Sequence, residues 1–119
     1  MENLILDFSG DTLTAVLMGD MDHHGVAGVR TQIDDAMFRL MPKILCIELS
    51  GVEFMDSSGL GLILGRYQKA SDLGIEVMLS NPSPRTEQHL RNTGCSSKVA
   101  INLERRMQIE QILLHIFRQ

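Results

Sequence analysis

The sequence predicts an α/β domain whose mixed β-sheet has four to five strands, opens with a β-hairpin and packs against about four helices. Two short segments of alternating apolar and polar residues come first, as in a hairpin. Segments with helical periodicity then take turns with short apolar segments of strand length, which is typical of parallel strands joined by helices. Because 119 residues suit one compact domain, a single domain is expected over 1–119.

Composition excludes several classes of function. Eleven Lys and Arg residues stand against fifteen Asp and Glu, and the basic residues are scattered, so no direct binding to nucleic acid is expected. The first residues show no signal peptide, and no apolar stretch reaches the roughly 20 residues of a membrane span. Cys46 and Cys95 belong to no pairing or metal-binding motif and are expected to be reduced. A cytoplasmic protein without membrane association, cofactor or metal is expected.

The first half of the chain predicts a hairpin, a helix and a central strand. Alternation over Leu4–Phe8 and Leu13–Leu17, around Ser9-Gly10-Asp11, indicates the hairpin. Apolar residues then recur at helical spacing from Val26 to Leu40. The nearly continuous apolar stretch Ile44–Leu49 is typical of a strand that is covered on both faces.

The second half predicts a longer helix, another strand and weaker elements. The helix that follows Ser58 is expected to end at Asp72, before Gly74, and the next strand covers Ile75–Leu79. Ser83-Pro84 opens a short helix that Gly94 is expected to close, and the region 85–97 is unusually polar. An edge strand at 99–101 and a final helix over 109–116 complete the prediction.

The most informative stretch is the turn that carries Ser57 and Ser58 between the central strand and the longer helix. Leu60, Ile63 and Tyr67 repeat at helical spacing after it, which places both serines at a helix N-terminus. Ser and Asp side chains cap such ends, and the uncapped N–H groups there favour an anion. The loops 20–24 and 53–59 each connect a strand to a helix, so they are expected to converge at the carboxyl edge of the sheet.

Enzymatic chemistry at this turn receives little support from the motifs. The Gly-x-Ser-x-Gly elbow of hydrolases is missing, because Met55 and Asp56 occupy the positions of its first glycine. The glycines after Ser58 match a dinucleotide fingerprint only in part, and no P-loop occurs. A small hydrolytic or nucleotide-binding enzyme that uses Ser57 and His24 stays an alternative.

Other polar residues have structural explanations that compete with functional ones. Asp22-His23-His24 could hold a metal, but a helix N-cap at Asp22 with two partly exposed histidines is the favoured interpretation. Arg66 and Lys69 are expected to be solvated charges. The glycines of the longer helix are expected to allow close approach of a neighbouring element or a partner. These glycines are Gly59, Gly61 and Gly65.

Phosphorylation by another protein would suit the serine turn. A phosphoryl group adds about −1.5 to −2 charges and three acceptor oxygens. A helix N-terminus tolerates that charge, whereas a partner that contacts the neutral hydroxyl would be repelled. Asp22 and Asp56, if they lie nearby, would make the surface more negative still.

Two stretches resemble the anti-sigma factor antagonists of the STAS-domain family. The first runs from Phe54 to Gly61, FMDSSGLG, and is followed at 63–67 by ILGRY. The second, Gly19 to His24, reads GDMDHH and is similar to the family's Gly-Glu-Leu-Asp-His-His, with Asp20 in place of Glu. The order of elements agrees with a single STAS-type domain over essentially the whole chain.

The resemblance implies a regulatory protein that is not an enzyme. Its unphosphorylated form would bind an anti-sigma factor with ATP-dependent serine kinase activity and so release the sigma factor. Phosphorylation of Ser57 would end this binding, and a serine phosphatase would restore it. Alone, the protein would be a monomer or weak dimer; a STAS scaffold in a stress-signalling complex is a further alternative. The partner-binding surface is expected at Asp22, His23, His24, Asp56, Ser58, Gly59, Leu60 and Gly61.

Overall fold

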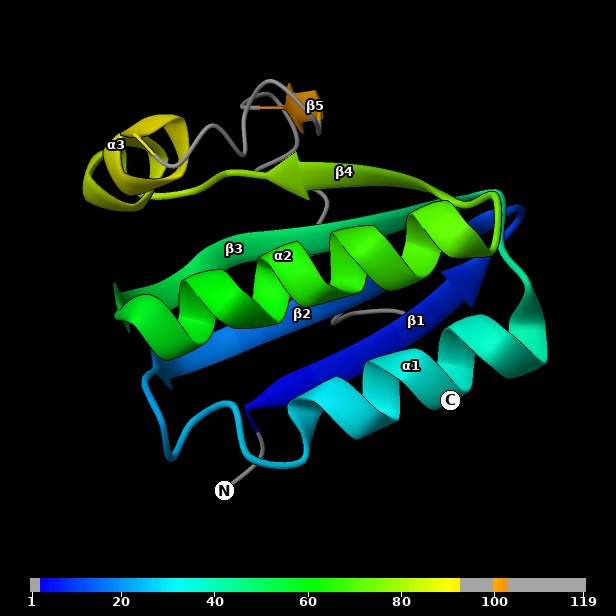
Figure 1. Ribbon diagram of the computed structural model, residues 1–119, viewed down its shortest axis with the longest axis horizontal. Coiled ribbons are helices and arrows are strands. Elements are labelled where there is room, and N and C mark those ends of the chain that lie inside the picture. The colour runs from blue at the N-terminus through cyan, green and yellow to red at the C-terminus, as the bar shows by residue number, and fades with distance from the viewer. Residues whose placement is uncertain (1–2, 93–99, 103–119) are drawn as a thin grey trace.

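The computed structural model describes residues 3–92 and 100–102 and confirms the predicted α/β architecture (Figure 1). Its five-stranded sheet has the order β1-β2-β3-β4-β5, with β1 antiparallel to β2 and the other neighbouring pairs parallel. The elements are β1 Leu4–Ser9, β2 Thr12–Met21, α1 Val29–Leu40, β3 Ile44–Met55, α2 Ser57–Asp72, β4 Glu76–Ser80, α3 Pro84–Asn92 and β5 Ala100–Asn102.

The opening hairpin forms as predicted. Phe8 pairs with Leu13 and Ser9 with Thr12, so the register is set by a tight turn. Gly10 in this turn has a φ of +60°, a conformation that glycine adopts without steric cost.

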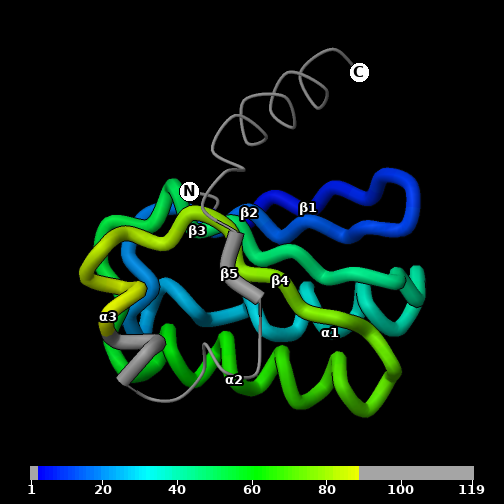
Figure 2. The backbone as a smooth tube through the Cα atoms, turned by 90° about the horizontal axis from the view of Figure 1, so that it is seen from above, coloured from blue at the N-terminus to red at the C-terminus, as the bar shows by residue number. Residues whose placement is uncertain are grey.

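Helices α1 and α2 lie side by side on one face of the sheet (Figure 2). Between them and the strands lies the hydrophobic core, which stabilises the domain by removing apolar surface from water. Within residues 3–92, no helix has the length and apolarity to cross a membrane. The helices contribute to the core Val29, Ile33, Ala36, Met37, Leu62, Ile63 and Ala70, and the strands contribute among others Leu13, Leu17, Met21, Leu45, Ile47, Leu49 and Leu79.

Two central strands are longer than the sequence predicts. β2 continues to Met21 and β3 to Met55, because their parallel pairing persists through two register shifts, at each of which β3 has one residue more than β2. Alternation is lost at those irregularities, so the polar residues near the ends do not look like a strand. The loop expected from Glu53 onward therefore begins only at Asp56.

Helix α1 begins three residues later than the start at Val26 that its apolar spacing suggests. Gly28 precedes it with a φ of +81°, which a right-handed helix does not accommodate, and residues 23–28 form turns. Val26 still packs against the core, which explains why it fits the helical spacing.

The remaining described elements agree with the prediction. α2 ends at Asp72, and Gly74 follows with a φ of +74°. The Ser83 hydroxyl accepts a hydrogen bond from the Thr86 N–H at 3.1 Å, so Ser83 caps α3 and Pro84 is its first residue. The final helix predicted over 109–116 and the cysteine at 95 lie outside the described residues.

Arg66 is buried, not solvated as its charge suggests. Its side chain extends from α2 toward α1, where Nε lies 2.8 Å from Asp34 Oδ1, and only 4% of the residue is exposed. Arg66 lies on the inner face of α2 together with Leu62, Ile63 and Ala70. The two helices are therefore joined by an ion pair within an otherwise apolar contact.

Replacing Asp34 by alanine tests the weight of this pair. Asp34→Ala leaves a buried guanidinium without its carboxylate, so we expect the free energy of unfolding to fall by about 1–3 kcal/mol. Asp35→Ala is the matched control, since it removes the same charge from an exposed neighbour on α1 and should change stability by less than about 0.5 kcal/mol. Urea unfolding at neutral pH measures both; equal effects would contradict a structural role for the pair.

Candidate functional site

The loops that follow β2 and β3 meet at one end of the sheet, as expected. Met21 pairs with Met55 at the last rung of the parallel ladder, and the Asp56 N–H donates a hydrogen bond to the Met21 carbonyl at 3.4 Å. Gly59, in the first turn of α2, packs against the same carbonyl. The Asp22 and Ser57 turns are therefore neighbours on one surface.

Asp56, not a serine, caps α2. Its Oδ1 accepts hydrogen bonds from the Ser58 N–H at 2.8 Å and the Gly59 N–H at 3.4 Å, and its own backbone is extended. Ser57 becomes the first residue of the helix and is exposed. Within the described part of the chain its side chain makes no hydrogen bond, so the hydroxyl is presented to solvent without a neighbouring base.

The expectation that Asp22 caps the following helix is wrong, because α1 begins only at Val29. The Asp22 carboxylate instead closes a turn of its own, accepting hydrogen bonds from the His24 N–H at 3.0 Å and the Gly25 N–H at 2.8 Å. These bonds, with that from Gly25 first, lower the pKa of Asp22 below its ordinary value. The carboxylate is therefore charged at neutral pH and holds the loop in shape.

His23 and His24 are exposed and do not share a ligand-binding geometry. Their ring centroids are 5.7 Å apart with an edge-on arrangement of the rings. Across residues 3–92, no three His, Cys, Asp or Glu side chains gather into a group that could hold a metal ion. Neither histidine hydrogen-bonds to Ser57 or Ser58 in this part of the chain.

The three glycines of α2 serve different purposes. A Cβ at Gly59 would lie 2.6 Å from the Met21 carbonyl oxygen and would also collide with the Met55 side chain, so close approach is required here. A Cβ at Gly61 or Gly65 would meet no atom within 4 Å. Close packing thus explains only the first glycine, while the other two leave space beside the helix.

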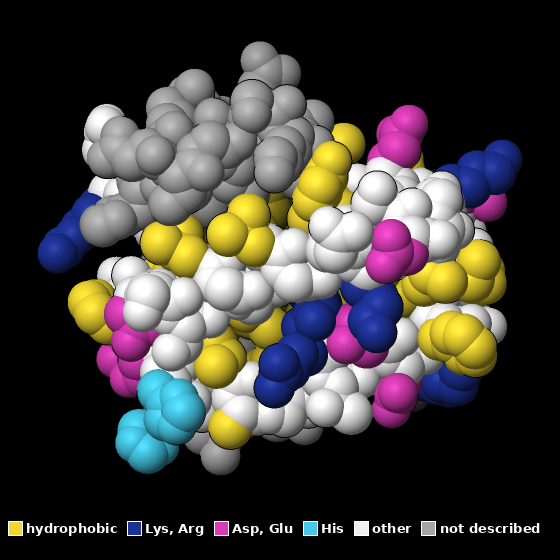
Figure 3. Space-filling model, viewed as in Figure 1, with side chains coloured by type: hydrophobic (Ala, Val, Ile, Leu, Met, Phe, Trp, Pro, Cys, Tyr) yellow, Lys and Arg dark blue, Asp and Glu magenta, His cyan; other side chains and the backbone are white. Residues whose placement is uncertain are grey.

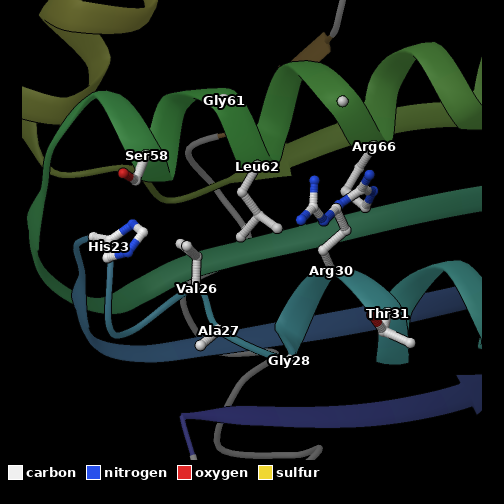
Figure 4. Close-up of a pocket in the computed structure, with 11 residues that line it drawn as sticks. His23, Val26, Ala27, Gly28, Arg30, Thr31, Ser58, Gly61, Leu62 and Arg66 are labelled. Atoms are coloured by element: carbon white, nitrogen blue, oxygen red, sulfur yellow. The ribbon is translucent and has the colours of Figure 1, made fainter.

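That space is a groove of about 520 Å³ between α1 and α2 (Figure 3). His23 and Ser58 lie at one end of it, and Arg30 and Arg66 lie at the other (Figure 4). Gly61 belongs to its wall, so three of the expected site residues share one hollow. Leu60 instead lies half-buried against the core.

Sequence reasoning missed the arginine end of the groove. One signal for Arg66 was present, since it falls at helical spacing from Leu62, Ile63 and Ala70 on the apolar face of α2. Arg30 gave no such signal, because only the packing of α1 beside α2 brings it close.

Paired glycine substitutions test the close approach of the two loops. Gly59→Ala forces the Met21 carbonyl or the Met55 side chain aside, so we expect a loss of about 1–3 kcal/mol in the free energy of unfolding. Gly61→Ala adds the same methyl group to open space two residues away and should raise stability by about 0.5–1 kcal/mol through helix propensity. Chemical denaturation of both variants decides; a stable Gly59→Ala protein would contradict the packing described.

Comparison with known proteins agrees with this architecture. The family model described as the STAS domain matches residues 3–108. The anti-sigma F factor antagonist of Lysinibacillus sphaericus is 39% identical over 74 residues, which cover 62% of this chain and 63% of that protein. The match thus spans less than two thirds of the relative's length.

Solved structures are similar over a larger part of the chain. The anti-sigma factor antagonist SpoIIAA in its unphosphorylated form has a TM-score of 0.74 at 28% identity, with 92% of this chain and 95% of that chain covered. The Bacillus cell fate determinant SpoIIAA in the phosphorylated form has a TM-score of 0.70 at 28% identity, with 92% and 98% covered. The match to the STAS domain model covers most of the sequence, including the serine turn and the Asp22 turn. This chain therefore belongs to the STAS-domain family.

Proposed function

We propose that this protein is an anti-sigma factor antagonist whose binding is switched off by phosphorylation of Ser57. The main observation behind this proposal is that Ser57 is the exposed first residue of α2, while Asp56 already caps the helix. Its hydroxyl is therefore available for modification without any loss of capping. The name of the Lysinibacillus relative supports the class of function, and the two forms of SpoIIAA support a phosphorylation switch.

Electrostatics explain how such a switch would act. Asp56 uses its carboxylate on the N–H groups of Ser58 and Gly59, so a phosphoryl group on Ser57 adds charge beside a carboxylate already in place. Asp22 contributes a further negative charge on the neighbouring turn. Phosphorylation would place about −1.5 to −2 additional charges against a partner surface that fits the neutral hydroxyl. The resulting electrostatic mismatch would weaken the complex.

The proposed partners follow from this switch. An anti-sigma factor with ATP-dependent serine kinase activity would bind the unphosphorylated surface, and a serine phosphatase would regenerate it. The contact surface would comprise the two turns and the first turns of α2. The protein would contribute no catalysis, would act in the cytoplasm as a monomer or weak dimer, and would serve a sporulation sigma factor. The contact residues are Asp22, His23, His24, Asp56, Ser58, Gly59, Leu60 and Gly61.

Mapping the phosphate after incubation with the cognate anti-sigma kinase and ATP tests the site. We expect a single phosphate on Ser57, because this hydroxyl is exposed whereas Ser58 is half-buried in the groove wall. Mass spectrometry of peptides locates the phosphate, with Ser57→Ala and a reaction without kinase as controls. Phosphate on Ser58, or incorporation by the chain alone, would overturn the assignment.

Variants of Ser57 test the charge mechanism. Ser57→Ala keeps a neutral surface and should bind the anti-sigma factor about as well as the wild type. Ser57→Asp adds a negative charge beside Asp56 and should weaken binding at least about tenfold, or about 1.4 kcal/mol.

Ser71→Asp is the matched control for this experiment, because it makes the same change at an exposed serine near the other end of α2. It should leave the affinity unchanged in calorimetry. Equal affinities of the two Ser57 variants, or equal losses for both aspartates, would argue against a local charge switch.

A further inference from the structure

The groove between α1 and α2 contains a buried guanidinium group whose hydrogen-bond donors are incompletely satisfied. Arg66 is 4% exposed, and its Nε faces Asp34 Oδ1 at 2.8 Å. The contact has the distance of an ion pair, but neither Nε nor Nη1 has a hydrogen-bond partner among residues 3–92. A guanidinium stays charged in proteins, and buried donors without partners are uncommon. Arg66 therefore has the capacity to interact with a further anion.

Arg30 brings a second positive charge to the same place. Figure 4 shows the Arg30 and Arg66 side chains reaching toward one another from the two helices. Burial lowers the pKa of Arg66, Asp34 opposes this, and the charge of Arg30 lowers the pKa further. Asp34 forms an ion pair with Arg66, and the charge of Arg30 lies close enough to act on the same guanidinium. These three groups therefore leave a local excess of positive charge in a protein whose net charge is −4.

The N-terminus of α1 adds donors at this point. Gly28 precedes the helix and offers no side chain to cap it, and the first turn of α1 has no acidic residue. Gly28, Arg30 and Thr31 all line the groove. Uncapped N–H groups at a helix N-terminus favour an anion. In this groove they lie on the same hollow as the buried guanidinium of Arg66.

We propose that this groove binds a small anionic molecule through a phosphate or carboxylate group held between Arg30 and Arg66. Its volume of about 520 Å³ lies in the range of small-molecule sites. Gly61 and Gly65 keep one wall free of side chains, so a ligand can lie against the backbone of α2. Arg30 is exposed and donates hydrogen bonds directly to the anion. Arg66 is held in place by Asp34 and attracts the anion from the buried side of the groove.

Titration of the isotopically labelled 119-residue chain with inorganic phosphate and, separately, citrate tests this site. Both are added at constant ionic strength, with sodium chloride alone as the reference, because unspecific screening affects every surface charge. We expect saturable changes in the amide resonances of Arg30, Thr31, Gly61 and Gly65. Saturation by phosphate alone indicates a phosphorylated ligand, and saturation by citrate indicates a carboxylate.

Arg30→Gln removes the exposed guanidinium group of the proposed site and leaves the hydrophobic core unchanged. It should weaken binding of the saturating anion about tenfold, which corresponds to the loss of one charge-assisted hydrogen bond. Arg39→Gln is the matched control, because it removes the same charge from an exposed position in the last turn of α1. The absence of saturation with both anions, shifts confined to residues outside the groove, or equal losses in the two variants would overturn the proposal.

Discussion

The parallel pairing of β2 with β3 along their full length is the constraint on which the rest of the structure depends. The ladder begins where Thr12 faces Ile44 and ends where Met21 faces Met55. Both strands therefore end at the same level, and both loops must start from there. Gly59 then allows α2 to begin against the Met21 carbonyl, which a side chain at this position would prevent. A register shift of one residue would displace the Asp22 turn from the Ser57 turn by about 3.3 Å.

Each of the two turns is made rigid by its own aspartate. Asp22 and Asp56 both accept two backbone N–H groups from residues two and three positions later. The same local solution thus serves a free-standing turn in one loop and a helix cap in the other. Because these carboxylates accept the hydrogen bonds of the backbone N–H groups in both turns, the hydroxyl of Ser57 is not needed as a cap. A position that is held in place and yet contributes nothing to holding the fold is well suited to reversible modification.

The sequence predicts the elements well where a single local signal decides them. The Ser57 helix, its end before Gly74 and the Ser83-Pro84 start follow from caps and periodicity. The apolar spacing predicts too early a start for α1, because Val26 packs against the core from a turn and periodicity reflects packing. The sequence predicts too early an end for β2 and β3, because the register shifts interrupt the alternation of apolar and polar residues. Local patterns do not report contacts between elements.

Arg66 illustrates the same limit for the site. Its position within the apolar face of α2 is visible in the sequence, but its meaning depends on Asp34 and Arg30, which reach it only after α1 packs beside α2. An apolar side chain of similar volume is often at least as stabilising as a buried ion pair. The fold alone therefore gives little reason for a guanidinium at position 66. The groove gives a reason, since it extends from this charge past Gly61 to Ser58 and His23 at the proposed partner surface. An anion held at one end of the groove would change the electrostatic field at the other, and the two ends are joined by the rigid backbone of α2.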